Sequence, residues 1–152
     1  MPECLETTVD KFTFRVAKGR LYTPEGVWIE PLQSNNPPRA RLGVTDYFQQ
    51  HNGDVAFATV KPRGTRLRSG DDFAEIETMK VTLELPSPFT GTIVEVNKAL
   101  ERNPELINQD PYGQGWLALI EPMAWEPDSA ELLDAAAYLA VVQSQAEEEL
   151  KS

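Results

Sequence analysis

The sequence predicts a mainly β protein with flanking helices, in the α+β class. Twelve prolines and nine glycines divide most of the chain into short runs, and many of these runs alternate between apolar and polar residues. Such alternation is typical of strands with one buried face. After Asp128 no glycine or proline interrupts the next twenty residues, which favours a helix at the C-terminus.

Each predicted strand is a short run of this alternating kind. In the first, residues 11–16, Phe12 and Phe14 are expected to face the same way. The remaining predicted strands lie at residues 27–30, 41–44, 55–60, 72–79, 81–85, 91–96 and 116–120. Residues 34–38 read Ser-Asn-Asn-Pro-Pro, which predicts a loop.

Three helical segments are predicted from their capping residues. Thr45 is expected to cap a short helix that has Asp46 in its first turn and ends near residues 52–53. Residues 103–105, Asn-Pro-Glu, predict a brief helical turn with Asn103 as its cap. Asp128, with an acid three residues later, resembles a capping box for the C-terminal helix, whose apolar stripe is expected at Leu132, Ala136, Leu139 and Ala140.

Composition excludes several classes of partner. The formal net charge of −10 argues against a nucleic-acid-binding protein, which would need a basic face. No apolar run approaches the roughly 18 residues that span a bilayer, and residues 1–10 lack the pattern of a secretory signal. We therefore expect a cytoplasmic protein that binds neither nucleic acid nor membrane.

Catalytic and metal chemistry is limited by the scarcity of suitable side chains. Cys4 is the single cysteine and His51 the single histidine. An internal disulfide, a zinc cluster of several cysteines and a metal site with two histidines are therefore excluded, and no nucleophile–base pair is expected. We expect a non-enzymatic protein with no catalytic residue and no metal site.

The segment that indicates a function is residues 75–85. Two alternating runs abut there with only Met79 and Lys80 between them, so Lys80 is expected at the tip of a hairpin with its side chain in water. Because neither residue is Gly, Asn or Asp, a type I geometry is favoured over a primed turn. An exposed lysine on a rigid hairpin suits covalent attachment of a carrier arm. The apolar neighbours Met79 and Val81 either contact the arm or a partner, or pack at the tip.

From residue 41 to residue 122 the sequence resembles the glycine cleavage system H-protein family. The motifs that carry the resemblance lie in the family's order along the chain: Gly43-Val44-Thr45-Asp46-Tyr47, Gly53-Asp54-Val55, Glu77 to Lys80, Ser87-Pro88-Phe89-Thr90-Gly91, Val94-Glu95-Val96-Asn97, Asn103-Pro104-Glu105-Leu106 and Asp110-Pro111-Tyr112-Gly113-Gln114-Gly115-Trp116, with Tyr22-Thr23 and Trp28 extending it toward the N-terminus. The resemblance implies a barrel-sandwich hybrid, the flattened β-barrel of lipoyl and biotinyl domains. It also implies lipoate amide-linked to Lys80.

Three departures from the family pattern bear on which metabolic pathway the protein serves. Gly26 stands where family members usually have a histidine, in a region that helps to hold the loaded arm. The hairpin reads Glu-Thr-Met-Lys-Val instead of Glu-Ser-Val-Lys-Ala. The chain also has an N-terminal strand segment and a long acidic C-terminal helix. These features are similar to the H-like lipoate-binding proteins of bacterial and archaeal sulfur oxidation.

The resemblance therefore predicts a lipoyl carrier whose arm on Lys80 shuttles a sulfur-bound intermediate for a heterodisulfide-reductase-like complex. The alternative is an H-protein that carries the aminomethyl group among the glycine cleavage enzymes. Either role implies a lipoate-protein ligase or lipoyl transferase and dihydrolipoamide dehydrogenase as partners. A biotin carrier is the third candidate, but Thr78 and Val81 replace the Ala and Met that flank the Met-Lys pair of biotin sites.

We also expect a division of the chain into three parts. Residues 1–20 are expected to be an N-terminal extension with a short strand. Residues 21–126 are expected to form the lipoyl-carrier barrel-sandwich domain, and residues 127–152 an acidic helix packed on that domain.

Overall fold

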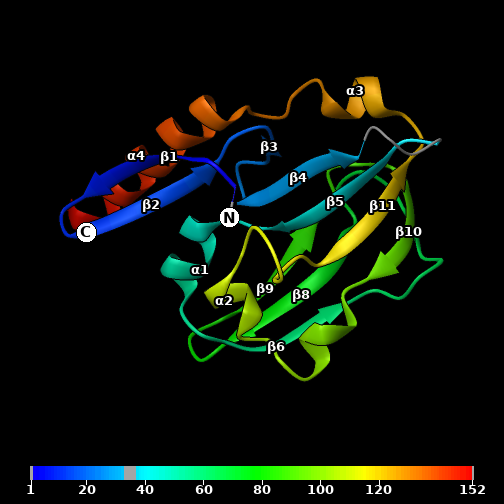
Figure 1. Cartoon of the computed structure of the whole chain (residues 1–152), viewed down its shortest axis with the longest axis horizontal. Helices are drawn as coiled ribbons and strands as arrows, with labels where there is room; N and C mark the ends of the chain where they lie inside the picture. The colour runs from blue at the N-terminus through cyan, green and yellow to red at the C-terminus, as the bar shows by residue number, and fades with distance from the viewer. Residues whose placement is uncertain (1, 33–36, 152) are drawn as a thin grey trace.

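Two sheets of unequal size enclose the main hydrophobic core (Figure 1). The computed structural model describes residues 2–32 and 37–151. The larger sheet has the strand order β3-β4-β5-β11-β10-β7, and the smaller has the order β6-β8-β9. Their strands are β3 (Leu21–Tyr22), β4 (Val27–Leu32), β5 (Arg39–Val44), β6 (Val55–Val60), β7 (Arg66–Leu67), β8 (Asp72–Thr78), β9 (Thr82–Pro86), β10 (Gly91–Val96) and β11 (Ala118–Pro122).

The inner faces of both sheets supply this core. Ile29, Leu42 and Ile120 of the larger sheet are fully buried, as is Ile76 of the smaller one. Their neighbours along each strand point outward, because side chains of a strand alternate between its two faces. The mainly β class and the flattened barrel-sandwich are therefore confirmed.

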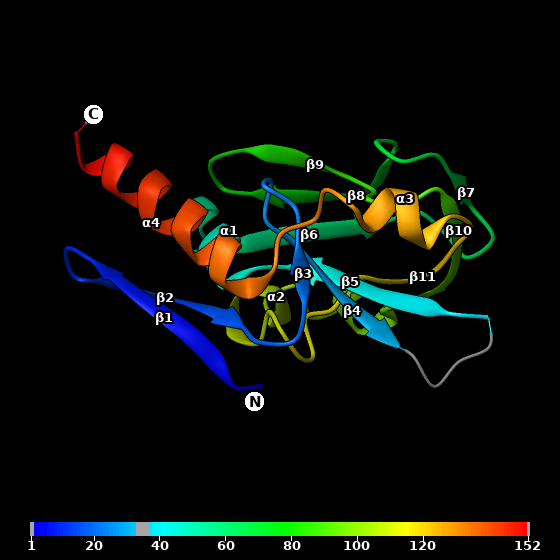
Figure 2. The same cartoon turned by 90° about the horizontal axis from the view of Figure 1, so that it is seen from above.

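A second core joins the two ends of the chain. Strands β1 (Cys4–Val9) and β2 (Phe12–Ala17) form a separate antiparallel hairpin, and helix α4 (Ala135–Lys151) lies beside it (Figure 2). Phe14 and Val16 belong to the same buried cluster as Tyr138 and Val142 of α4. The sequence predicted only one strand in this region. Phe12 and Phe14 face the same way as predicted, with stacked rings, although Phe12 is half exposed and Phe14 is buried.

The short helix α1 (Asp46–Asn52) is capped as predicted. The Thr45 hydroxyl accepts a hydrogen bond from the N–H of Phe48 at 3.2 Å, and Asp46 lies in the first turn. The helix ends at Gly53, whose φ of 85° is a backbone conformation that glycine adopts without steric cost. Helix α1 thus directs the chain from the larger sheet into β6 of the smaller one.

The predicted caps of the two later helices are wrong. Asp128 lies inside a short helix, α3 (Trp125–Ser129), and its carboxylate accepts a hydrogen bond from the N–H of Thr90. Helix α4 begins seven positions after Asp128, and Asp134 caps it by accepting from the N–H of Ala137 at 2.8 Å. Helix α2 (Leu106–Gln109) follows the 3₁₀ turn η1 (Lys98–Glu101) and has Glu105 at its N-cap position instead of Asn103.

The predicted apolar stripe of α4 is correct for two of its four residues: Leu132 and Leu139 are partly buried against the cores. The buried residues are Tyr138, Val142 and Ala146, spaced four apart, whereas Ala136 and Ala140 are exposed. The reason lies in the segment before the helix, which is extended: the backbone of residue 133 exchanges two hydrogen bonds with that of residue 22. This pairing sets where the helix starts and which face turns to the β1–β2 hairpin.

The predicted loop and the predicted division of the chain are not tested by the structure. The loop predicted at residues 34–38 lies mostly outside the described residues. The division into residues 1–20, 21–126 and 127–152 stays a prediction.

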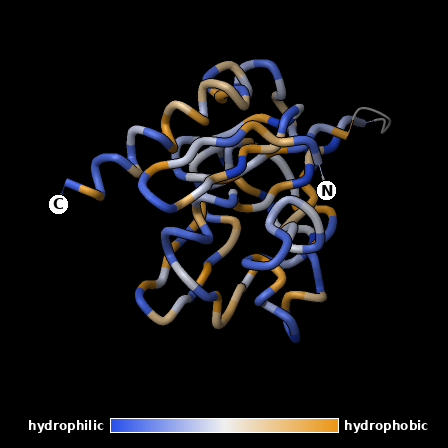
Figure 3. Tube along the Cα trace, turned by 60° about the vertical axis from the view of Figure 1, so that its left-hand side comes forward, coloured by the Kyte–Doolittle hydropathy of each residue, from blue (hydrophilic) through white to orange (hydrophobic). Residues whose placement is uncertain are grey.

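Figure 3 shows that apolar and polar residues alternate along much of the chain. Among the described residues, no helix is long and apolar enough to cross a membrane.

Candidate functional site

Lys80 lies at the tip of the hairpin between β8 and β9. The last paired residues of the two strands are Glu77 and Thr82. Beyond them the N–H of Thr78 donates a hydrogen bond to the carbonyl oxygen of Val81 at 2.9 Å, which closes the turn. Neither Met79 nor Lys80 has a positive φ, in agreement with the prediction against a primed turn.

The Thr78 hydroxyl stiffens this turn by hydrogen bonds to its backbone. The side chain is almost fully buried, and its oxygen accepts from the N–H groups of Lys80 and Val81, both at 3.2 Å. Sequence reasoning missed this role, although a threonine two residues before a turn position is a known signal for such a bond. The backbone that carries the lysine is therefore held while its side chain remains free to move.

The Lys80 side chain is exposed and forms no ion pair with a carboxylate in residues 2–32 or 37–151. Its apolar neighbours are exposed as well: Met79 retains 89% of its accessible surface and Val81 retains 37%. The reading in which these two side chains pack at the tip is therefore wrong for Met79. An amine in this position is open to an acylating enzyme.

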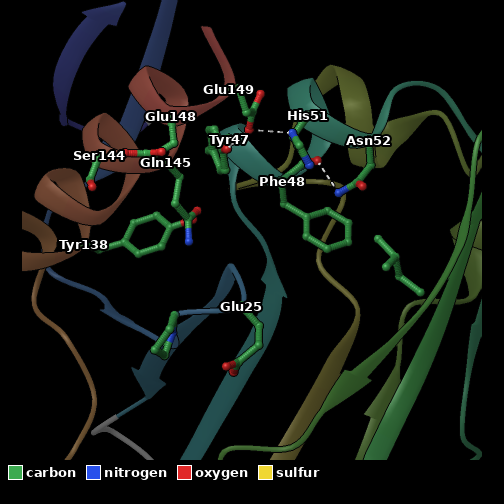
Figure 4. A pocket seen from close by; sticks show the side chains of 12 residues that line it. Glu25, Tyr47, Phe48, His51, Asn52, Tyr138, Ser144, Gln145, Glu148 and Glu149 are labelled. Carbon is green, nitrogen blue, oxygen red and sulfur yellow. Dashed lines mark hydrogen bonds and ion pairs between the residues drawn. The ribbon is translucent and has the colours of Figure 1, made fainter. Parts of the chain in front are cut away.

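A cavity of about 510 Å³ lies beside the hairpin (Figure 4). Its wall includes Leu83, three residues after Lys80 on β9, together with residues of α1, of α4 and of the turn before β4. Phe48 and Tyr138 supply aromatic surface, and Asn52 and Gln145 supply amide groups. The cavity is therefore of mixed character, with both apolar and polar wall.

One side of the cavity is closed by contacts between α1 and α4. The imidazole Nδ1 of His51 lies 2.9 Å from a carboxylate oxygen of Glu149, and the Tyr47 hydroxyl donates to the same carboxylate. Burial, and then the hydrogen bond to Glu149, raise the pKa of Tyr47. Sequence reasoning used His51 only to exclude metal sites and missed this contact, which joins residues far apart in the chain.

Carboxylates outnumber bases in the cavity wall. Glu25, Glu148 and Glu149 contribute acidic groups, and His51 is the one basic side chain among the lining residues that the structure describes. Such a wall favours a neutral or cationic occupant over an anionic one. Among the described residues, no group of three or more His, Cys, Asp or Glu side chains could hold a metal ion.

Gly26 is a crowded position with a backbone conformation that disfavours the histidine usual there in the H-protein family. It has a φ of 96°, and an added Cβ would meet the Cβ of Phe48 at 3.3 Å and the Tyr138 hydroxyl at 3.4 Å. A side chain at this position would therefore be strained and crowded. The space at position 26 is occupied by the aromatic residues of α1 and α4.

The two facing sheets and the exposed hairpin lysine define a carrier domain of the flattened barrel-sandwich class. Residues 20–145 match the family model described as "Glycine cleavage H-protein". The chain belongs to the glycine cleavage H-protein family. Members of this family are lipoyl carriers, with lipoate attached covalently to a lysine, and they are generally non-catalytic.

Relatives from several bacteria support this assignment. The "Glycine cleavage system H protein" of Bacteroides fragilis is 45% identical over 121 residues, which cover 80% of this chain and 92% of the relative. The protein of the same name from Thermus thermophilus is 39% identical over 131 residues, covering 86% of this chain and 98% of the relative. The crystal structure of a glycine cleavage system H protein from Mycobacterium marinum superposes with a TM-score of 0.73 at 33% identity, covering 82% of this chain and 97% of that one.

These matches support the glycine-cleavage alternative better than the sulfur-oxidation role that the sequence analysis preferred. Both relatives and the solved structure carry the name of the glycine cleavage system H protein. The specific variant that serves a heterodisulfide-reductase-like complex has no support from them. The departures at Gly26 and in the hairpin therefore do not by themselves identify another pathway.

Proposed function

We propose that Lys80 is the lipoylated residue and that the arm carries the aminomethyl group of glycine among the glycine cleavage enzymes. The observation that carries this proposal is the exposed Lys80 side chain on a turn whose backbone is held by Thr78. Family membership supplies the lipoate. The proposed setting is the cytoplasm, and the proposed partners include dihydrolipoamide dehydrogenase and a lipoate-protein ligase or lipoyl transferase.

The residues around the tip fit such a group. Attachment forms an amide bond between the Lys80 nitrogen and the carbonyl carbon of an activated lipoyl donor. The donor's leaving group departs with the bonding electrons, and the ammonium nitrogen gives up two of its three protons. When bound, lipoate supplies a disulfide that exchanges with thiols and can be reduced to a dithiol. Because it is tethered, its effective concentration near a docked enzyme is about millimolar.

The cavity beside the hairpin supports a cationic cargo. An aminomethyl group is positively charged at neutral pH, whereas persulfide and thiosulfonate cargoes are anionic. Glu25, Glu148 and Glu149 in the wall favour the first over the second. In this proposal Leu83 and Phe48 provide the apolar part of the wall along which the arm rests.

One observation favours sulfur transport as the second candidate. Position 26 has no side chain, so any contact that a histidine makes there in other family members is absent. The second candidate has the same lipoyl arm on Lys80 and differs in cargo and partner enzymes.

Mass spectrometry of the intact chain tests the proposal. Incubation with lipoate, ATP and a lipoate-protein ligase should add one lipoyl group, and Lys80→Arg should abolish the addition without loss of the fold. The lipoylated chain is then mixed with glycine and glycine decarboxylase. Aminomethylation supports the first candidate. Its absence, together with sulfur loading by a heterodisulfide-reductase-like complex, supports the second, and an addition that survives in Lys80→Arg contradicts both.

A further inference from the structure

The outward face of the three-stranded sheet leads directly to the Lys80 turn. Exposed and buried side chains alternate along β6, β8 and β9, so one face of this sheet is open to solvent. We call this surface the outer face and define it by its exposed residues, Phe57, Thr59, Glu75, Glu77, Thr82 and Glu84. Glu77 and Thr82 are the pair next to the turn, so the outer face and Lys80 form one continuous surface.

Apolar side chains gather where the outer face meets the turn. Phe57 lies opposite Glu77 on the neighbouring strand and is 65% exposed. Met79 is two residues beyond Glu77, in the turn itself, and is 89% exposed. Of the six large hydrophobic side chains that are exposed in the described part of the chain, three belong to this region: Phe57, Met79 and Val81. Such clustering marks an interaction site more often than isolated exposure does.

The rest of the outer face carries three carboxylates, Glu75, Glu77 and Glu84, and none of them forms an ion pair within residues 2–32 and 37–151. Glu75 lies directly opposite Glu84 on adjacent strands, and like charges in that position destabilise a sheet. A hydrogen bond with Asp72, the charge of Asp72 and the charge of Glu75 raise the pKa of Glu84, and Lys61 is the base that opposes them. A basic partner surface would relieve this repulsion.

The side of the sheet opposite the outer face is covered by other parts of the chain. The N–H of Val55, at the start of β6, donates to the side-chain oxygen of Asn108 of α2 at 2.9 Å. On β9, Leu83 turns toward the cavity beneath α1. An enzyme that approaches the tip therefore has the outer face as its open side.

We propose that the outer face is the docking surface of the enzyme that acylates Lys80, and that this enzyme presents Lys or Arg side chains around an apolar recess for Phe57. The inference rests on the proposed function. The acylating enzyme must bring its active site within reach of one unmodified lysine side chain, so it has to contact the hairpin itself. Enzymes that react with the far end of the finished arm are reached through a longer tether and do not need this contact.

Lipoylation kinetics of the full-length chain test the inference. The initial rate of lipoyl addition is measured by intact mass against chain concentration, with a lipoate-protein ligase, lipoate and ATP. Phe57→Ser should lower kcat/KM about tenfold, chiefly through KM. The double variant Glu75→Gln, Glu84→Gln should lower it as well and flatten its dependence on salt.

Matched controls lie elsewhere on the surface. Phe12→Ser removes another exposed phenylalanine, and the double variant Glu101→Gln, Glu105→Gln removes two other exposed carboxylates. Both should be lipoylated like the unmodified sequence. Circular dichroism and urea midpoints confirm that each variant is folded.

The outcomes separate this inference from the proposed function. Outer-face variants that keep the original kcat/KM and salt dependence, while Lys80 of the parent chain is lipoylated, overturn the docking surface alone. Absence of lipoylation at Lys80 in the parent chain overturns the proposed function, and the inference with it. Once lipoylated, the outer-face variants should have the parent's KM with glycine decarboxylase. A defect confined to that enzyme would assign the surface to a different partner and contradict the inference.

Discussion

The indole ring of Trp28 occupies the space that a side chain at position 43 would need. A Cβ added to Gly43 would lie 2.4 Å from two atoms of the ring. The same indole donates its N–H to the carbonyl oxygen of Pro111 at 2.9 Å, and the guanidinium of Arg20 lies over the ring at 4.4 Å from its centroid. Trp28 thus joins β4, β5 and the segment after α2 through one side chain.

Gly43→Ala should therefore destabilise the fold. The added methyl group overpacks a site where the neighbour is a large, fully buried ring, and such changes cost about 1–3 kcal/mol. Urea denaturation should show a lower midpoint with an unchanged slope. In a Trp28→Leu background the same substitution should cost less, because the ring is gone. Equal costs in the two backgrounds would contradict the contact.

Thr78→Val should loosen the turn that carries Lys80. Valine has nearly the same shape but cannot accept the hydrogen bonds from the N–H groups of Lys80 and Val81. We expect a loss of about 1 kcal/mol in the free energy of unfolding and faster amide hydrogen exchange at those two residues. Thr78→Ser keeps the hydroxyl and should behave like the parent. Unchanged exchange in the valine variant would show that the turn holds without the hydroxyl.

Asn108→Ala should weaken the junction of α1, α2 and β6. The Asn108 side chain accepts from the N–H of Val55 and donates to the carbonyl oxygen of Gly53, both at 2.9 Å, and it also donates to Gln49 at 3.2 Å. Removing it leaves partly buried backbone groups without these partners, at a cost of about 2 kcal/mol. Thermal unfolding measures the effect. Asn108→Asp keeps the hydrogen-bond acceptor but loses the donor. Its thermal stability should therefore lie between that of the parent and that of Asn108→Ala.

Alkaline pH should destabilise the chain through its tyrosines. Burial is the main cause that raises the pKa of all four, Tyr22, Tyr47, Tyr112 and Tyr138, and for Tyr138 the pKa rises to about 12. In the unfolded chain a tyrosine ionises near pH 10. Above that pH the unfolded state holds fewer protons than the native state, so the free energy of unfolding falls as the pH rises toward 12 and beyond.

The absorbance of phenolate during a pH titration measures this effect. The phenolate absorbance should rise at the same pH at which the circular dichroism signal is lost. It should not rise near pH 10 while the chain is still folded. Tyr138→Phe should make the loss of stability with pH shallower than in the parent. A full phenolate signal near pH 10 without unfolding would show that the tyrosines are not buried as the structure indicates.

Much of the barrel follows from interactions between near neighbours in the sequence. Alternation placed the longer strands of the two sheets but not the two-residue strands β3 and β7. The Thr45 cap with Asp46 in the first turn placed α1, because these signals depend on residues a few positions apart. Helix α4 was misplaced for the opposite reason. Its start depends on the pairing of Leu133 with Tyr22, which no local pattern reveals.

The candidate site divides in the same way. Two abutting strand patterns were enough to place Lys80 at a hairpin tip. The cavity beside it was not predictable, because its wall combines residues from α1, α4 and β9 that only the tertiary structure brings together. His51 and Glu149 illustrate this, since neither belongs to a motif that predicts their contact.

The packing of the β1–β2 hairpin against α4 has a consequence for biosynthesis. Strands β1 and β2 leave the ribosome well before helix α4, which completes their core. A nascent chain that ends before α4 can assemble the barrel, while its N-terminal hairpin still lacks the surface on which it packs. The second core therefore cannot form before α4 has been made, and chains cut short near residue 135 should expose that hairpin to proteases first.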